Sequence, residues 1–448
     1  MILRGFRYKL EPTPEQGSLF RQFAGVCRLI YNLALEQRRD WYRHFERQTG
    51  KKLNYISQAR ELTALRSEYD WVAAVSQTCE QQALRDLDKA FSRFFKGAAG
   101  YPAPRKKGSH ESFRFQGREL ETKRLNAKWS AVRLPKIGWV KYRDTRALPS
   151  APVNATVTCA ANGWHIAFAC EVEAKASAGT GASVGIDRGV ANTLSFSTGE
   201  RLSVPTSLAK VDKLKRRAQR TASRRLRGSK RRALSLQKVA KLSAQAARMR
   251  RDWHHRVALD IAQRFELVVL EDLRIKNMTA SARGTAEAPG KNVAQKAGLN
   301  RSILSQGWGG FEAILAYKLE DRGGALICVN PAFTSQTCSE CGVIDRESRE
   351  SQAVFSCRHC GFRGHADNNA AVNILRRNTA SMRMEEGHQL SVEVRTGRGL
   401  RPPEKLPASA GSGILRRRSS QRLRGKTTEN GRFRAMVPLE TQQSQGFA

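Results

Sequence analysis

The chain has 448 residues, with 79 lysines and arginines against 40 aspartates and glutamates, which gives a formal net charge of +39. A charge of this size makes a polyanion such as nucleic acid the expected partner. Hydrophobic residues make up 40% of the chain, which favours folded domains, about two to four at this length, over a purely ribosome-like or disordered basic protein. No apolar run approaches the roughly eighteen residues of a membrane span, so no membrane partner is expected.

Residues 13–95 predict a helical region. Thr13 suits an N-cap, Pro14 the first helical position, and Gln16 the return bond of a capping box. Apolar residues then follow at helical spacing. Two further helices are expected, one around 57–66 and one that carries Leu84, Leu87, Phe91 and Phe94.

Glycine and proline interrupt the helical pattern in the stretch GAAGYPAPRKKGSHESFRFQ. This stretch contains three basic and three aromatic residues, Arg105, Lys106, Lys107, Tyr101, Phe113 and Phe115. Basic residues beside exposed aromatic rings suit a nucleic-acid strand. A solvated loop next to a strand explains the same residues equally well, so both interpretations stay open.

The segment ATVTCAANGWHIAFACEV predicts a β-hairpin. Apolar residues alternate on both sides of Asn162-Gly163, and this dipeptide fits a type I′ turn. Together with the preceding WSAVRLPKIGWVKYR, residues 128–173 predict a small β-domain. The following KASAGTGAS is expected to be a linker.

Beyond the linker, strands alternating with helices predict an α/β domain. SVGIDRGVANTLSFSTGE indicates a strand, a turn and a second strand, and the apolar runs 267–270 and 325–329 indicate two more strands. A long helical stretch is expected over 210–264. The basic residues of its first half include Lys213, Lys215, Arg216, Arg217, Arg224 and Arg225. Such a run is usually a solvated face, but the total charge favours contact with phosphate.

Four of the nine cysteines form two C-x-x-C pairs, and these four are Cys338, Cys341, Cys357 and Cys360. The spacing matches a zinc ribbon, in which four thiolates fill a tetrahedral zinc ion and leave no open position, so the predicted site is structural. The other cysteines, Cys27, Cys79, Cys159, Cys170 and Cys328, lie in apolar patterns and are expected in the core.

Three acidic residues stand where catalytic metal ligands are expected. Asp187 and Glu271 each end an apolar strand, and Asp367 starts an amphipathic helix. Singly, they are explained as a turn residue, a strand-end charge and a helix N-cap. The ends of two strands and the start of a helix can also meet at one edge of a sheet. Three carboxylates there would bind a pair of divalent cations, and Mg²⁺ suits such hard oxygen ligands.

Several motifs together resemble the TnpB (OrfB) family of insertion-sequence proteins, which is related to type V CRISPR effectors. The motifs are GIDRGVANTLSFS, VLEDLRIKNM, TSQTCSECG, FSCRHCG and HADNNAAVNIL, and the resemblance covers roughly residues 1–378. It implies a multidomain α/β fold. An RNase H-like RuvC nuclease domain would be split by the zinc ribbon, and an N-terminal β-barrel wedge domain would carry an inserted helical recognition domain. The implied boundaries are 1–12 and 96–175 for the wedge, 13–95 for the recognition domain, 181–336 and 362–378 for the nuclease, and 337–361 for the ribbon.

The resemblance also implies an activity. Members are RNA-guided DNA endonucleases, so we expect structural Zn²⁺, catalytic Mg²⁺ held by Asp187, Glu271 and Asp367, a guide RNA from the element itself, and a double-stranded DNA target. The expected location is the prokaryotic cytoplasm, on the nucleoid when the protein is bound to DNA. One alternative is a nuclease-inactive RNA-guided regulator, which should lack one of the three carboxylates. Another is a transposase or accessory protein of an insertion sequence.

Two features depart from the family pattern. His365-Ala366-Asp367 stands where many relatives have Asp-Arg-Asp, although the expected catalytic aspartate is kept. Residues 379–448 have no clear family counterpart and are expected to form a disordered basic tail. Only six residues separate Cys360 from Asp367, so we expect the zinc ribbon to position this carboxylate.

Overall fold

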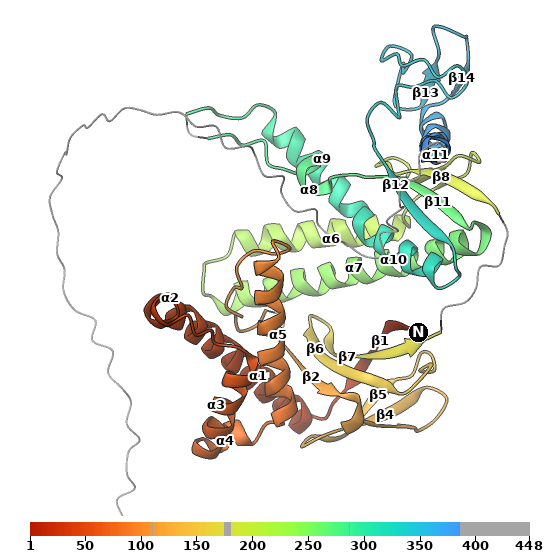
Figure 1. The fold of residues 1–448 in the computed structure, drawn as a ribbon. Helices are drawn as coiled ribbons and strands as arrows, with labels where there is room; N and C mark the ends of the chain where they lie inside the picture. Colours follow the sequence, from red (N-terminus) through yellow and green to blue (C-terminus); the bar gives the residue numbers. More distant parts are fainter. Residues whose placement is uncertain (110, 174–180, 286, 386–448) are drawn as a thin grey trace, which may run out of the picture. The chain divides into compact units, whose positions relative to one another are not determined.

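The computed structural model describes residues 1–109, 111–173, 181–285 and 287–385 (Figure 1). Most of the predicted linker and residues 386–448 of the predicted tail therefore lie outside the described residues. The last described helix, α11 (Ala366–Glu385), runs past the boundary expected at 379. None of the described helices is long and apolar enough to cross a membrane.

The first sheet has seven antiparallel strands in the order β2-β6-β7-β1-β5-β4-β3. The strands are β1 (Ile2–Glu11), β2 (Ser112–Gln116), β3 (Glu121–Arg124), β4 (Trp129–Leu134), β5 (Gly138–Arg143), β6 (Pro152–Ala160) and β7 (Gly163–Val172). The edge strands β2 and β3 are joined through the short 3₁₀ helix Gly117–Glu119. A connection this short reaches about 18 Å, whereas seven flat strands span about 29 Å. The sheet must therefore curl so that its edges approach, as in a barrel.

Helices lie between β1 and β2 in the chain (Figure 1). They are α1 (Pro14–Trp41), the π-helical turn Tyr42–Glu46, α2 (Arg47–Thr49), α3 (Tyr55–Glu68), α4 (Asp70–Ala73) and α5 (Gln77–Phe95). The predicted capping box is confirmed, since Thr13 and Gln16 exchange their bonds at the start of α1.

The helices and the curled sheet share one hydrophobic core. Phe20 and Phe23 of α1 contact Phe113, and Phe23 also contacts Phe115. The open interpretation that places exposed aromatic rings beside a nucleic-acid strand does not hold for Phe113 and Phe115, because β2 turns both rings toward α1 and buries them. Tyr101 remains half exposed.

The β6–β7 hairpin forms, but not with the expected turn. Ala160 pairs with Gly163, so the two loop residues are Ala161 and Asn162. Only Gly163 has a positive φ here, at 111°, which rules out a type I′ turn with Asn162-Gly163 at its centre. Gly163 therefore adopts its positive φ as the first residue of β7, one position after the two loop residues, and glycine allows this conformation without strain.

The second sheet has five strands in the order β10-β9-β8-β11-β12. These are β8 (Ser183–Asp187), β9 (Leu194–Phe196), β10 (Arg201–Leu202), β11 (Leu267–Glu271) and β12 (Ala325–Val329). The strands β8, β11 and β12 are parallel, while β9 runs antiparallel to both of its neighbours, β8 and β10. Buried residues of β8, β9 and β11 pack with α7 (Lys230–Arg264) and α10 (Trp308–Glu320) in a second core.

The predicted helical stretch 210–264 is interrupted. It comprises α6 (Thr206–Ser223) and α7, which pack against each other as a hairpin. Gly228 has a φ of 86°, and the Ser229 side chain caps α7 by accepting from the Arg232 N–H. The remaining helices are α8 (Ile275–Met278) and α9 (Val293–Gln306).

Three of the five cysteines expected in the core are buried, and Cys159 and Cys328 are not. Cys159 lies at the end of β6 beyond the buried Ala155 and Val157, and Cys328 lies on the edge strand β12. Apolar alternation predicts which face a residue occupies, but not where along the strand the core ends.

Candidate metal centres

Two of the predicted catalytic carboxylates end neighbouring strands. In the parallel pair β8 and β11, Ile186 lies opposite Leu270. Asp187 and Glu271 are the next residues, so their side chains leave the same carboxyl edge of the sheet. This is the edge at which open α/β sheets carry their ligand sites.

Asp367 reaches this edge from α11, which packs along β8 (Figure 1). A methyl group on Gly185 would lie 2.8 Å from the Leu375 N–H nitrogen and closer still to the Ala371 carbonyl oxygen. The helix backbone therefore lies directly on β8, and only a glycine leaves room for it. This packing places the first turn of α11, with Asp367, over the end of the strand.

Glu271 and Asp367 are buried, Asp187 is half-buried, and the charges of the first two act on Asp187. Burial, then the charges of Glu271 and Asp367, raise the pKa of Asp187 to about 7. Burial also raises the pKa of Glu271, opposed by a hydrogen bond of 2.5 Å from the Thr334 hydroxyl. Such mutual repulsion is relieved when a cation binds, so the donor set and its excess negative charge fit a divalent metal.

Among the described residues, the four cysteines form the group of three or more potential ligand atoms that all lie within 4.8 Å of one another. The oxygen atoms of the three carboxylates therefore do not all lie within this limit. Side chains that the sequence analysis missed hold the carboxylates. Asn192 donates to Asp367 Oδ2 at 3.0 Å, and Arg349 lies 3.8 Å from Asp367 Oδ1. The buried Arg188 donates to the Glu271 carbonyl oxygen and to Glu312. The sequence offers one signal for Arg188 and Asn192, because both follow Asp187 closely in the same motif.

The four predicted zinc ligands converge. Their sulfur atoms all lie within 4.8 Å, with Cys338 to Cys360 and Cys341 to Cys357 both at 3.7 Å. A zinc ion with bonds of about 2.3 Å to four sulfurs at tetrahedral angles separates them by about 3.8 Å. The cluster therefore fits a four-thiolate zinc ion.

The two halves of the ribbon repeat one local structure, C-x-x-C-G. Gly342 and Gly361 have φ values of 74° and 75°, and each donates its N–H to the carbonyl of the first cysteine in its knuckle at 3.0 Å. Backbone N–H groups of Cys360 and His359 lower the pKa of Cys357 to about 6, which favours the metal-binding thiolate. The strands β13 (Val354–Ser356) and β14 (Arg363–His365) then lead directly into α11.

The predicted nucleic-acid contacts fall into two groups. Exposed side chains are those of Lys106, Lys107, Lys213, Arg216, Arg217 and Arg224. The others are held within the protein: Lys215 pairs with Asp212, and Arg225 bonds to Ser235.

Arg105 is likewise engaged. Its guanidinium lies 3.9 Å from the centre of the Tyr31 ring and pairs with Asp86 at 3.3 Å, while its backbone bonds to Asn32. These contacts favour a structural role for Arg105.

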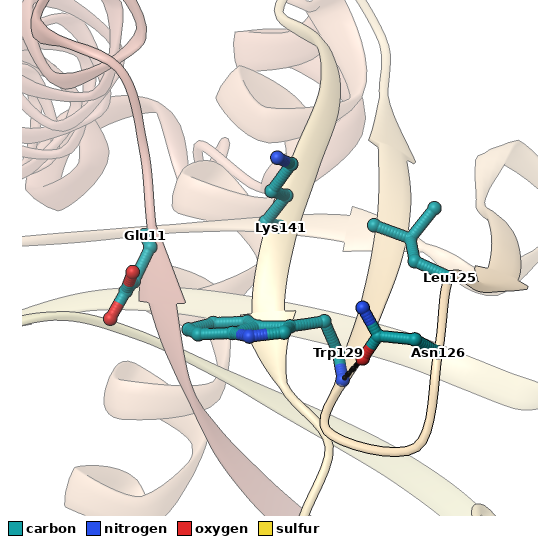
Figure 2. A pocket seen from close by; sticks show the side chains of 5 residues that line it. All are labelled: Glu11, Leu125, Asn126, Trp129 and Lys141. Atoms are coloured by element: carbon teal, nitrogen blue, oxygen red, sulfur yellow. Dashed lines mark hydrogen bonds between the residues drawn. The ribbon is translucent and has the colours of Figure 1, made fainter.

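Figure 2 shows a pocket elsewhere, on the seven-stranded sheet. It is lined by Glu11, Leu125, Asn126, Trp129 and Lys141. The Asn126 side chain accepts from the Trp129 N–H at 3.0 Å and holds the loop before β4. None of the predicted catalytic, zinc or basic residues lines this pocket.

Three family models match separate parts of the chain. They are the Cas12f1-like TNB domain over 308–374, the OrfB_IS605 model described as "Probable transposase" over 167–282, and a helix-turn-helix domain over 1–47. In the last range the structure has a strand followed by one long helix, β1 and α1.

Two curated relatives align along nearly the whole chain. "Putative RNA-guided DNA endonuclease InsQ" of Escherichia coli K12 is 35% identical, over 91% of this chain and 99% of that protein. "Putative RNA-guided DNA endonuclease" of Streptomyces pristinaespiralis is 29% identical, over 92% and 98%. A solved Cas12f1–sgRNA–target DNA complex is similar in fold, with a TM-score of 0.54 and 16% identity over 81% of this chain and 83% of the other. The chain belongs to the TnpB family.

Proposed function

We propose that this protein is an RNA-guided DNA endonuclease that hydrolyses phosphodiester bonds at Asp187, Glu271 and Asp367. The observation that carries this proposal is the position of three carboxylates at one sheet edge, the buried Glu271 and Asp367 and the half-buried Asp187, where burial and the neighbouring charges raise the pKa of Asp187. Both full-length relatives carry names with the same activity. The five-stranded sheet with its packed helices α7 and α10 supports the α/β nuclease domain that the resemblance to the family implies.

Each part of the site has a separate task in this proposal. A pair of Mg²⁺ ions bound there would activate water and stabilise the leaving oxygen. Asp187 and Glu271 supply oxygen ligands from rigid strand ends, and Asp367 supplies a third from α11. Thr334 and Asn192 orient two of these carboxylates through hydrogen bonds, so their rotamers are set before DNA arrives.

The remainder of the chain would hold the guide RNA and the DNA target. The net charge of +39 suits several nucleic-acid strands, and exposed arginines on α6 and in the following turn are available to phosphate. We assign the curled sheet, residues 1–12 and 96–175, to the wedge domain and helices 13–95 to the recognition domain. The nuclease would comprise 181–336 and 362–378, with the zinc ribbon at 337–361. Base pairing would then read the target sequence, as in other guided systems.

The test is cleavage of a plasmid that matches a guide supplied by co-expression. Asp187→Ala should abolish cutting and preserve guided binding, because the substitution removes a metal ligand and leaves the basic surfaces intact. Asp252→Ala is the control, since Asp252 is an exposed partner of Arg256 on α7. Undiminished cutting by Asp187→Ala would refute the assignment.

The same assay distinguishes the alternatives. A nuclease-inactive regulator would bind the matched plasmid and leave it uncut in the wild type as well. A transposase, the description attached to one matching family model, would cut at element ends without a matching guide. The presence of all three carboxylates favours the nuclease.

A further inference from the structure

Two buried asparagines of α11 join the zinc ribbon to the acidic site. Asn369 and Asn373 lie four residues apart on one face of the helix and are almost fully buried. Asn369 accepts from the Ser339 N–H at 2.7 Å, inside the first zinc knuckle, and donates to the Thr337 carbonyl at 2.7 Å. Asn373 donates to the carbonyls of Thr334 and Thr337 at 3.0 and 2.6 Å.

The segment that these amides hold also reaches the carboxylates. The Thr334 hydroxyl donates to Glu271 Oε1, and its carbonyl is the acceptor for Asn373. Asp367 lies two residues before Asn369 on the same helix. The contacts therefore form a continuous path from the zinc-binding sulfurs through two amides to two of the three acidic ligands.

We propose that Asn369 and Asn373 form an amide clamp through which zinc binding sets the positions of Glu271 and Asp367 for the catalytic cations. This inference rests on the proposed function. The two asparagines are positioning residues, because neither touches the reacting groups. The clamp adds a non-covalent route to the six-residue connection between Cys360 and Asp367, and it also reaches Glu271, which that connection does not.

Burial is what makes the clamp rigid. Deleting one partner of a buried hydrogen bond costs more stability than the bond itself normally contributes. The reason is that the remaining polar group stays buried without a partner. Asn369 bonds to backbone groups through its side-chain oxygen and its amide nitrogen. Asn373 donates from its amide nitrogen to two backbone carbonyls. These bonds hold the knuckle and α11 in one relative position. Outer-shell partners of metal ligands typically change metal affinity by about 10- to 100-fold when they are removed.

The experiment is a double-mutant cycle on the full-length protein, with Mn²⁺ affinity measured by electron paramagnetic resonance of the free ion. Only binding that Asp187→Ala removes is counted. Asn369→Ala should keep its zinc and bind Mn²⁺ about tenfold more weakly, and Cys357→Ser should lose zinc and weaken Mn²⁺ binding by a similar factor. If the two substitutions act through one path, the double variant should bind Mn²⁺ about tenfold more weakly than the wild type, and not a hundredfold more weakly.

Two further variants complete the design. Asn368→Ala is the matched control, since the Asn368 side-chain oxygen has no hydrogen-bond partner among the described residues, and it should leave Mn²⁺ affinity unchanged. Asn373→Leu keeps most of the side-chain volume and removes the second amide, so it repeats the test if Asn369→Ala unfolds.

The failures are distinguishable. If the wild type shows no Mn²⁺ binding that depends on Asp187, the acidic site and the clamp are both refuted. If that binding is present, but the asparagine variants match the wild type or the effects of Asn369→Ala and Cys357→Ser multiply, only the clamp is refuted.

Discussion

Replacing Gly185 with alanine tests whether the direct packing of α11 on β8 positions the third carboxylate. The added methyl would lie 2.8 Å from the Leu375 nitrogen and closer still to the Ala371 carbonyl oxygen, and ordinary contact begins at 3.4 Å, so the helix must move by more than 0.6 Å. The obstructing atoms belong to the helix backbone and cannot rotate away. Overpacking of this kind costs about 1–3 kcal/mol of stability.

The expected effect on catalysis, about 2.7 kcal/mol for a 100-fold loss, is comparable with the effect on folding. A displacement approaching 1 Å at a reacting group can reduce the rate by about 100-fold. We therefore expect Gly185→Ala to cut a matched target about 100-fold more slowly in single-turnover assays, with unchanged guided DNA binding.

Gly5→Ala is the control for this experiment. Gly5 also lies in a strand, but a methyl there meets nothing within 4 Å, so this variant should cut normally. Wild-type cleavage by a folded Gly185→Ala protein would show that the position of α11 on the sheet does not control the chemistry.

Three further outcomes are expected. Neutralising Arg216, Arg217 and Arg224 together should weaken RNA binding and reduce the slope of log affinity against log salt by about 2–3. An unchanged slope would show that these arginines only form a solvated face. Cys357→Ser should lose zinc and most cleavage while guide-RNA affinity falls less; zinc loss with a wild-type cleavage rate would contradict the scaffold role. Burial lowers the pKa of His254 to about 4, below its unfolded value near 6.5. The folded state therefore resists protonation, and up to about 3 kcal/mol of stability present above pH 6.5 should be lost as the pH falls toward 4, which denaturant titrations of wild type and His254→Gln would measure.

Much of the candidate site could be predicted because its signals are local in sequence. A carboxylate directly after an apolar strand identifies Asp187 and Glu271, and C-x-x-C spacing identifies the zinc ligands, whose sulfurs the structure brings together. The interruption between α6 and α7 also has a local signal, Gly228 followed by the capping Ser229, which the charge pattern obscured.

The rest depended on contacts between distant segments. Nothing local distinguishes Phe113 and Phe115 from exposed aromatic residues, because their burial comes from α1, about ninety positions earlier. The same holds for the loop residue Arg105, whose partners Tyr31 and Asp86 lie on α1 and α5. The amides of Asn369 and Asn373 acquire a role only when the ribbon folds back beside α11.

The order of elements along the chain has a consequence for synthesis. Chains leave the ribosome from the N-terminus, and N-terminal parts fold first. The basic hairpin of α6 and α7 is complete at Arg264, whereas β8 receives its covering helix only after residues near 375 have emerged. In the proposed function, a nascent chain would therefore present a basic surface for RNA well before Asp367 completes the acidic cluster. Newly made protein would then meet its RNA while it still lacks the complete set of proposed metal ligands.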